Sequence, residues 1–204
     1  MLYYSKIKGA KSIDIKYTYA TIKDLPRIVD IYNQSIASKQ ATADLEPITV
    51  DSRVPWFEAH HADSRPLWVM RHGDHIVGWI SLSDFYGRPA YQQTAEISIY
   101  LDLVTRGHHL GKAALAFVET QLHRLKIQTV LAFVFDMNQA SKKLFLKNGY
   151  AVWGHLPKVA NMGNQENDLI ILGKKYQNKK KRCTFCLCDK NVCFFLLLTT
   201  QMTH

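Results

Sequence analysis

The 204 residues are 47% hydrophobic and 11% aromatic, enough for one well-formed core, and this excludes a largely disordered chain. The formal net charge of +9 comes from the two ends, because residues 13–173 contain sixteen basic and sixteen acidic residues, so the central region does not resemble a nucleic-acid binder. The apolar run at 193–198 falls far short of the ~20 residues of a membrane-spanning helix, and we expect a cytoplasmic protein with neither nucleic acid nor membrane as partner.

The first half of the chain predicts a strand, two helices and a hairpin. Residues 13–20 alternate as a half-buried strand does, and residues 21–37 show helical periodicity after Thr21 and Asp24 in capping-box spacing. A short helix is predicted at 49–61, capped by Thr49 or Asp51. Two β-rich runs around a Gly-Asp turn predict a hairpin over 67–85.

The second half predicts strands at 94–102, 129–135, 150–156 and 168–176, with helices between them. Residues 107–124 form a long amphipathic helix, and residues 138–149 form a second helix that ends at Gly149. The run at 129–135 is almost wholly apolar, as in a strand buried on both faces. The order β-α-α-β-β-β-α-β-α-β-β predicts a single α/β domain.

All four cysteines lie in the last 22 residues, which sets this segment apart from the core. A core without cysteine cannot be held by disulfides and fits a reducing compartment. The spacing of Cys183, Cys186, Cys188 and Cys193 lacks the two separated pairs of a zinc ribbon, so we expect no metal. We therefore predict a basic N-terminal extension at 1–12, one domain at 13–176, and a basic, cysteine-containing disordered tail at 177–204.

The stretch at 106–112 predicts a loop that opens a helix directly after a strand. It is one residue too short for the G-x-x-x-x-G-K-[ST] loop of nucleoside triphosphate enzymes, and it lacks the G-x-G-x-x-G dinucleotide pattern. Free backbone N–H groups and the positive end of a helix dipole would still converge there. From these residues alone, the loop either binds a pyrophosphate without metal or is only structural.

Four segments of the chain resemble one enzyme family. Residues 95–115, AEISIYLDLVTRGHHLGKAAL, resemble the acetyl-CoA motif R/Q-x-x-G-x-G/A of the GNAT family of N-acetyltransferases, and residues 138–150, NQASKKLFLKNGY, resemble the motif that follows it. Residues 79–100 and 155–176 are similar to segments of its phosphinothricin and methionine sulfoximine acetyltransferase branch. The resemblance covers 13–173 and implies a GNAT fold, a mixed and mostly antiparallel central sheet flanked by helices.

The resemblance also implies the positions that hold acetyl-CoA. A backbone N–H near Tyr100 or Leu101 would hold the thioester oxygen, and Asn138 and Ser141 would contact the pantetheine arm or the adenosine side. The amides of the loop would hold the pyrophosphate; they belong to Arg106, Gly107, His108, His109, Leu110, Gly111 and Lys112.

Two residues depart from the family pattern. His109 stands where the family usually has a glycine, and either adds a hydrogen-bond donor or faces solvent. Phe145 stands where many relatives have a Tyr or His that could protonate the thiolate, so a Tyr-type general acid is not expected there.

Acetyl transfer needs a neutral amine, and therefore a base, because a lysine-like amine has a pKa near ~10.4. Glu96, in an otherwise apolar strand, matches the glutamate of the family and is our candidate base. The acceptor would lie among Arg88, Tyr91 and Thr94 on one side and Lys158 and Asn161 on the other, with Arg88 as a partner for an acceptor carboxylate.

The leading hypothesis is an acetyl-CoA-dependent N-acetyltransferase that acts on a small amino-acid-like amine by direct attack in a ternary complex, as a homodimer and without metal. Transfer to a protein N-terminus, a lysine or a polyamine is the alternative within the fold. A non-catalytic CoA-binding protein and a nucleic-acid binder driven by the basic ends are alternatives of other classes.

Overall fold

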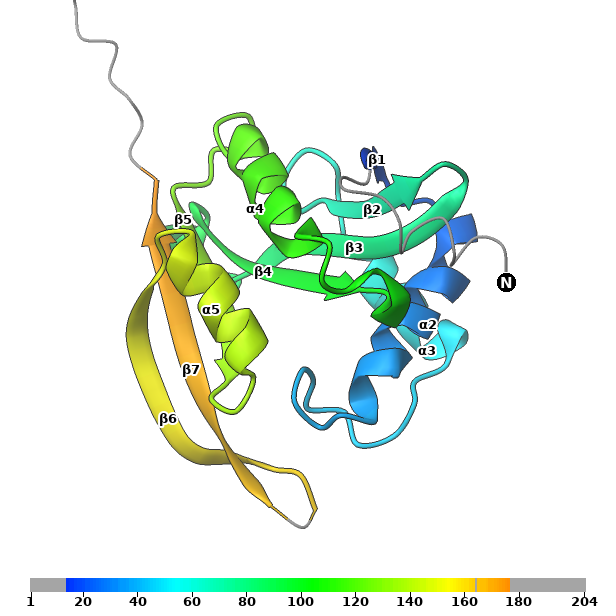
Figure 1. Cartoon of the computed structure of the whole chain (residues 1–204). Helices are drawn as coiled ribbons and strands as arrows, with labels where there is room; N and C mark the ends of the chain where they lie inside the picture. Colours follow the sequence, from blue (N-terminus) through cyan, green and yellow to red (C-terminus); the bar gives the residue numbers. More distant parts are fainter. Residues whose placement is uncertain (1–13, 164, 177–204) are drawn as a thin grey trace, which may run out of the picture.

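The computed structural model describes residues 14–163 and 165–176 (Figure 1). The predicted N-terminal extension at 1–12 and the cysteine-containing tail at 177–204 lie outside the described residues. Within the described part of the chain, no helix is long and apolar enough to cross a membrane.

Seven strands form one sheet in the order β1-β2-β3-β4-β5-β7-β6. All neighbouring pairs are antiparallel except β4 and β5, which are parallel. The sequence thus predicted the element order and the mixed, mostly antiparallel sheet correctly. The strands are β1 (Lys16–Tyr19), β2 (Leu67–His72), β3 (His75–Asp84), β4 (Thr94–Leu101), β5 (Thr129–Phe135), β6 (Ala151–Asn161) and β7 (Glu166–Lys175).

Four α-helices cover the two faces of the sheet, with α4 and α5 on one face and α2 and α3 on the other (Figure 1). The predicted range 107–124 was too long, because Gly107 and His109 have φ angles of 86° and 59° and place residues 107–109 in a loop. The helices are α2 (Leu25–Ile36), α3 (Val50–Glu58), α4 (Leu110–Gln121) and α5 (Gln139–Lys147).

Two hydrophobic clusters hold these layers together. On one face, Leu110, Ala114 and Val118 of α4 pack against the apolar residues of β5, as the helical and strand patterns predicted. On the other face, Ile28 and Tyr32 of α2 are buried in a second cluster with side chains of β2 and β3. The sheet is therefore covered on both sides around its centre.

The centre of the sheet contains a break. β4 and β5 pair only from Thr94 to Glu96, opposite Thr129 to Leu131. Beyond these three pairs the strands diverge, although β4 stays paired with β3 from Ala95 to Leu101 and β5 with β7 from Thr129 to Phe135. A wedge therefore opens between two well-supported strands.

The helix caps read from the sequence are present. The Thr21 N–H donates to Asp24 Oδ2 at 2.9 Å, and the Thr49 side chain accepts from the Ser52 N–H at 3.2 Å. Gly149, with φ 83°, follows α5 in the left-handed region.

Asp24 connects the start of α2 to the sheet, and substituting it tests how much this connection stabilises the fold. Burial raises the pKa of its carboxyl, but hydrogen bonds from Thr21 and from Arg71 of β2 outweigh this and leave the pKa below its ordinary value. Because its pKa is lower in the folded state, the ionised Asp24 carboxylate stabilises the fold at any pH above the unfolded-state pKa. This stabilisation is lost as the pH falls through the folded-state pKa. We expect Asp24→Asn to lower the free energy of unfolding by about 1.5 to 3 kcal/mol at pH 7.

Urea unfolding from pH 7 to pH 3 measures this. The difference between wild type and Asp24→Asn should begin to shrink below about pH 4, where Asp24 protonates in the unfolded state, and should be lost as the pH falls through the lower pKa of the folded state. The control is Asp63→Asn, since Asp63 is fully exposed and 3.9 Å from Arg124, and it should change stability by less than about 0.5 kcal/mol. A difference that does not depend on pH would contradict the assignment.

Candidate active site

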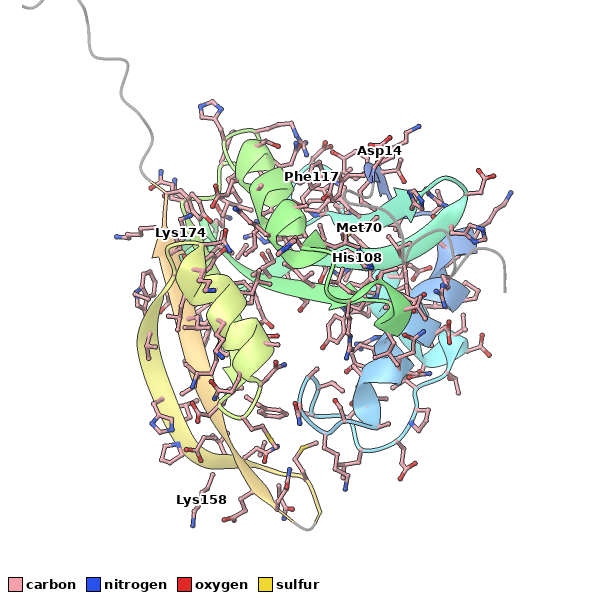
Figure 2. The ribbon with its side chains drawn as sticks, in the orientation of Figure 1. Asp14, Met70, His108, Phe117, Lys158 and Lys174 are labelled. Atoms are coloured by element: carbon pink, nitrogen blue, oxygen red, sulfur yellow. The ribbon has the colours of Figure 1, made fainter. Side chains whose placement is uncertain are left out.

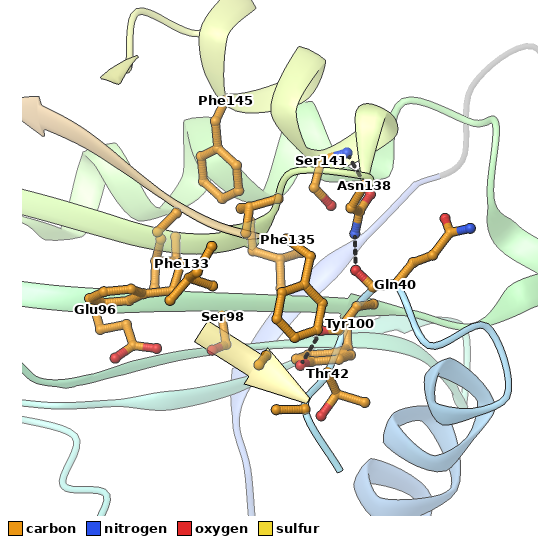
Figure 3. A pocket seen from close by; sticks show the side chains of 18 of the residues that line it. Gln40, Thr42, Glu96, Ser98, Tyr100, Phe133, Phe135, Asn138, Ser141 and Phe145 are labelled. Atoms are coloured by element: carbon orange, nitrogen blue, oxygen red, sulfur yellow. Dashed lines mark hydrogen bonds between the residues drawn. The ribbon is translucent and has the colours of Figure 1, made fainter. Parts of the chain in front are cut away.

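A cavity of about 570 Å³ occupies the wedge between β4 and β5 (Figure 3). Its walls come from segments far apart in sequence. They are Gln40–Ala43 of the loop after α2, Glu96–Tyr100 of β4, Ala132–Phe135 of β5, Val159–Asn161 of β6 and Met162 just after it, Leu169 of β7, and Asn138, Ser141 and Phe145 at or in α5.

Glu96 is an unpaired carboxylate in this cavity. It is half-buried and makes no hydrogen bond or ion pair with any residue that the structure describes, and burial raises the pKa of its carboxyl. Strand alternation places Ser98 and Tyr100 on the same face. Glu96 can therefore accept a proton from a ligand more readily than an exposed glutamate can.

The backbone of β4 offers hydrogen-bonding groups to the wedge. The Asp102 N–H donates to the Val77 carbonyl at 2.9 Å, and Asp102 lies opposite Val77 in the β3–β4 register. Hydrogen-bonded pairs alternate along antiparallel strands, so the backbone of Tyr100 also faces β3 and that of Leu101 faces the wedge. This register favours the Leu101 amide over that of Tyr100 as the donor to a bound thioester, and it adds Ile99, which the sequence interpretation missed.

The side chain of Tyr100 closes one end of the cavity. Its hydroxyl donates to the Ala41 carbonyl at 3.0 Å, and its ring stacks on Trp79 with the centroids 4.6 Å apart. Burial raises the pKa of Tyr100, so the phenol stays protonated and keeps donating.

The loop between β4 and α4 presents a row of free amides. Within the described residues, none of the N–H groups from Gly107 to Lys112 donates a hydrogen bond, and the first intrahelical bond runs from the Ala113 N–H to the His109 carbonyl at 3.2 Å. The buried Thr105 fixes the loop, because its hydroxyl bonds to the carbonyls of Val77 and Asp102. Six consecutive amides at a helix N-terminus suit a pyrophosphate.

The side chains of this loop have different roles. Arg106 and Lys112 are exposed and form no ion pair with the described residues. A Cβ at Gly111 would lie 2.8 Å from Leu144 of α5, so this glycine permits the close packing of α4 on α5. His109 caps α4 in the left-handed conformation, which a glycine adopts at lower cost.

Asn138 joins α5 to the loop after α2. As the N-cap of α5, its side chain accepts from the Ser141 N–H at 3.0 Å, and it donates to the Gln40 carbonyl at 3.2 Å (Figure 3). Ser141 and Phe145 line the same side of the cavity. Phe145 offers no proton, and Tyr150 beside it is not part of the lining.

Of the five residues predicted to hold the acceptor, only Asn161 lines the cavity. Arg88 and Tyr91 border a separate hollow of about 150 Å³, which Phe85 also lines; the ring centroid of Phe85 lies 6.4 Å from that of Phe133 in the cavity wall. Lys158 points outward from the β6–β7 pair (Figure 2), and its N–H donates to Asp168.

Thr94 begins β4, two residues before Glu96, and does not line the cavity. Besides Ile99, the sequence interpretation missed the Gln40–Ala43 wall, whose composition carries no motif. Among the described residues, no group of three His, Cys, Asp or Glu side chains could hold a metal ion.

A wedge between diverging parallel strands, a row of free amides at the next helix and a carboxylate in the cavity define an acyl-CoA-dependent acyltransferase. The model of the acetyltransferase (GNAT) family matches residues 28–150. The chain belongs to this family, an N-acetyltransferase family, and acetyl-CoA is its co-substrate.

Proteins with high similarity include members of one branch. The chain is 44% identical over 154 residues to the Bacillus subtilis protein named "Putative phosphinothricin acetyltransferase YwnH", covering 75% of this chain and 94% of that protein. It is 25% identical to the Escherichia coli L-amino acid N-acyltransferase MnaT, covering 76% of this chain and 90% of MnaT.

Solved structures give the same family. One titled as the crystal structure of "a putative phosphinothricin N-acetyltransferase" has a TM-score of 0.78 and 41% identity, covering 81% of this chain and all of the other. The acetyltransferase yncA of Salmonella typhimurium, solved with acetyl-CoA, has a TM-score of 0.74 over 85% of this chain and 99% of the other; at 22% identity it shows the fold alone.

His109 tests whether the loop binds through its backbone. We expect His109→Gly to raise the free energy of unfolding by about 1 kcal/mol, because it relieves the left-handed residue, and to change the Kd of CoA by less than about threefold. Denaturant unfolding and calorimetric titration with CoA measure both. The control is His108→Gly: His108 has no positive φ, so this substitution should lower the free energy of unfolding. A tenfold higher Kd of CoA in His109→Gly would show instead that the His109 imidazole itself donates to the ligand.

Proposed function

We propose that this protein transfers the acetyl group of acetyl-CoA to the amine of a small amino-acid-like molecule of the phosphinothricin or methionine sulfoximine and sulfone type. The observation that carries the proposal is the unpaired Glu96 carboxylate, with a raised pKa, in a cavity at the point where β4 leaves β5. Relatives named as phosphinothricin and methionine sulfoximine acetyltransferases support this acceptor class.

The reaction proceeds by direct attack in a ternary complex. Glu96 removes a proton from the ammonium group, directly or through one water, and the amine nitrogen attacks the thioester carbon. The amides of Ile99 and Leu101 stabilise the oxyanion that forms. The C–S bond then breaks, the nitrogen releases its second proton to solvent, the acetyl group stays on nitrogen as an amide, and CoA leaves as a thiolate that takes up a proton from solvent.

The loop amides of 107–112 hold the pyrophosphate during this reaction, and Asn138 and Ser141 lie beside the pantetheine arm. Phe145 cannot protonate the thiolate. A thiol with a pKa near ~8.5 is a good leaving group at neutral pH, so the mechanism needs no acid there.

Glu96→Gln tests the proposed base. We expect kcat/KM for L-methionine sulfone to fall by about 10²- to 10⁴-fold with little change in KM for acetyl-CoA, because an amide cannot accept the proton. In wild type, kcat/KM should rise as the pH increases through the pKa of Glu96, which lies above its ordinary value of 4.5. This pH-dependent rise should be absent in Glu96→Gln.

The assay is release of CoA thiol across methionine sulfone, methionine sulfoximine, phosphinothricin, polyamines and N-terminal peptides. Glu46→Gln, at an exposed glutamate outside the cavity, is the control. Activity only with peptides or polyamines would contradict the proposed acceptor class. Binding of CoA without release of CoA thiol with any acceptor would favour a non-catalytic CoA-binding protein.

We also propose a cytoplasmic homodimer. The absence of cysteine before residue 183 supports a reducing compartment, and the neutral charge of residues 13–173 gives no reason to add a nucleic-acid partner. Strand β6 is at the sheet edge, and Val152, Trp153 and Leu156 are exposed on it. Edge strands with exposed apolar residues are frequent sites of association.

Light scattering after size exclusion tests the dimer. The measured mass of wild type should be twice that of one chain. The double variant Val152→Glu, Leu156→Glu should have the mass of one chain, because dimerisation would bury the introduced charges at the interface. Leu103→Glu, at another exposed apolar residue away from β6, is the control. A wild-type monomer at all concentrations would remove this part of the proposal.

A further inference from the structure

The loop after α2 crosses the wedge between β4 and β5 as a strap, residues 39–43. Its residues Gln40–Ala43 line the cavity. On the β4 side, the Tyr100 hydroxyl donates to the Ala41 carbonyl at 3.0 Å. On the β5 side, the side chain of Asn138, between β5 and α5, donates to the Gln40 carbonyl at 3.2 Å (Figure 3). The strap is therefore tied to both walls of the wedge.

Further contacts hold the two ends of the strap. The buried Asn167 of β7 donates from its side chain to the Lys39 carbonyl at 3.3 Å, and the Lys39 ammonium donates to the Met162 carbonyl at 3.3 Å. At the other end, the buried Thr42 hydroxyl is hydrogen-bonded to the hydroxyl of Tyr32 in α2. The strap thus has partners on α2, β4 and β7 as well as at the start of α5.

Side chains, and not the backbone of a neighbouring element, fix the strap. Within the described residues, no backbone–backbone hydrogen bond involves residues 40–43. Three successive strap carbonyls, those of residues 39, 40 and 41, each accept from a side chain of a different part of the fold. Loops without backbone partners are the easily displaced parts of a protein. The position of this wall therefore depends on a few side-chain donors, each of which one substitution removes.

The strap is also the wall through which the cavity can change its length. Apart from Met162, the other walls belong to strands of the sheet or to α5 and its cap. The cavity of about 570 Å³ has to hold both the acetyl end of the cofactor and the acceptor, so its walls limit how long the acceptor can be. A strap freed on one side would give a longer acceptor more room.

We propose that the strap limits the length of the acceptor, and that Tyr100 and Asn138 are positioning residues that hold the strap in place. The inference rests on the proposed function and refines its substrate class. Compact amino acids fit beneath the strap, whereas longer amines collide with it and are acetylated more slowly. Asn138 then acts on the acceptor side of the cavity as well as beside the cofactor.

Two conservative substitutions each remove one donor to the strap. Tyr100→Phe removes the hydroxyl but keeps the ring that stacks on Trp79. Asn138→Asp removes the amide donor but keeps an oxygen that accepts from the Ser141 N–H, and a carboxylate is favourable at a helix N-terminus. Each variant should therefore free one side of the strap and leave the fold intact.

The test compares acceptors that differ in length. They are methionine sulfoximine, its S-butyl homologue, which is longer at the side chain, and its dipeptide with a C-terminal glycine, which is longer at the carboxyl end. Release of CoA thiol gives kcat/KM, and the discrimination ratio is kcat/KM for methionine sulfoximine divided by that for the better of the two longer acceptors.

We expect a discrimination ratio of at least about tenfold in wild type and a fall of about five- to tenfold in Tyr100→Phe and in Asn138→Asp. The melting temperature should stay near that of wild type, and KM for acetyl-CoA should change by less than about threefold. Hydrogen–deuterium exchange measures the strap without any acceptor, and the amides of residues 40–43 should exchange faster in both variants.

Asn33→Asp is the matched control. The Asn33 side chain also accepts from one backbone N–H and donates to one carbonyl, both of Ile48, and neither residue lines the cavity. Its discrimination ratio and the exchange of residues 40–43 should stay within about twofold of wild type. An equal fall of the ratio in Asn33→Asp would show that the ratio reports general loosening of the fold, and the inference would fail.

The inference also fails if either strap variant keeps the wild-type ratio or the wild-type exchange of residues 40–43. An unchanged ratio with a raised KM for acetyl-CoA in Asn138→Asp would assign Asn138 to the cofactor alone. In these cases a wild type that acetylates methionine sulfoximine keeps the proposed function. A wild type that acetylates none of the three acceptors removes the reaction itself, and with it the inference.

Discussion

The parallel pairing of β4 with β5 ends after three residue pairs, and the whole candidate site depends on this break. Backbone amides buried without partners are costly, so a sheet interrupted at its centre needs either a filling side chain or a ligand. Here no side chain fills the wedge, and about 570 Å³ remains open. The pairing of β4 with β3 and of β5 with β7 keeps both walls rigid, so the opening does not collapse.

The break also divides the chemistry between the two faces of the sheet. On the face of α4 and α5, the free amides of 107–112 and the capped start of α5 present donors but few charges, which suits a cofactor held by its phosphates and amides. On the face of α2 and α3, Glu96 presents an unpaired carboxylate to the cavity and Tyr100 closes one end of it. A cofactor and an acceptor can therefore meet in the wedge from opposite faces, as direct transfer between two bound substrates requires.

Sequence periodicity predicted the seven strands and the four α-helices of the described residues in the correct order, because buried faces repeat with the period of each element. It also placed Glu96, Ser98 and Tyr100 on one face, since strand alternation is a local property. The predicted start of α4 was wrong because His109 adopts the left-handed conformation, which cannot be predicted from a histidine in the sequence. Gly111 matched a phosphate-binding motif in the sequence. The structure gives a different reason for a glycine there, because a side chain would collide with Leu144 of α5.

The acceptor side could not be derived in the same way, because its walls come from tertiary contacts. Gln40–Ala43 carries no motif, and its place in the cavity depends on Tyr100 bonding to Ala41 and on Asn138 bonding to Gln40. This wall is therefore a property of the folded chain, and no local pattern in the sequence predicts it.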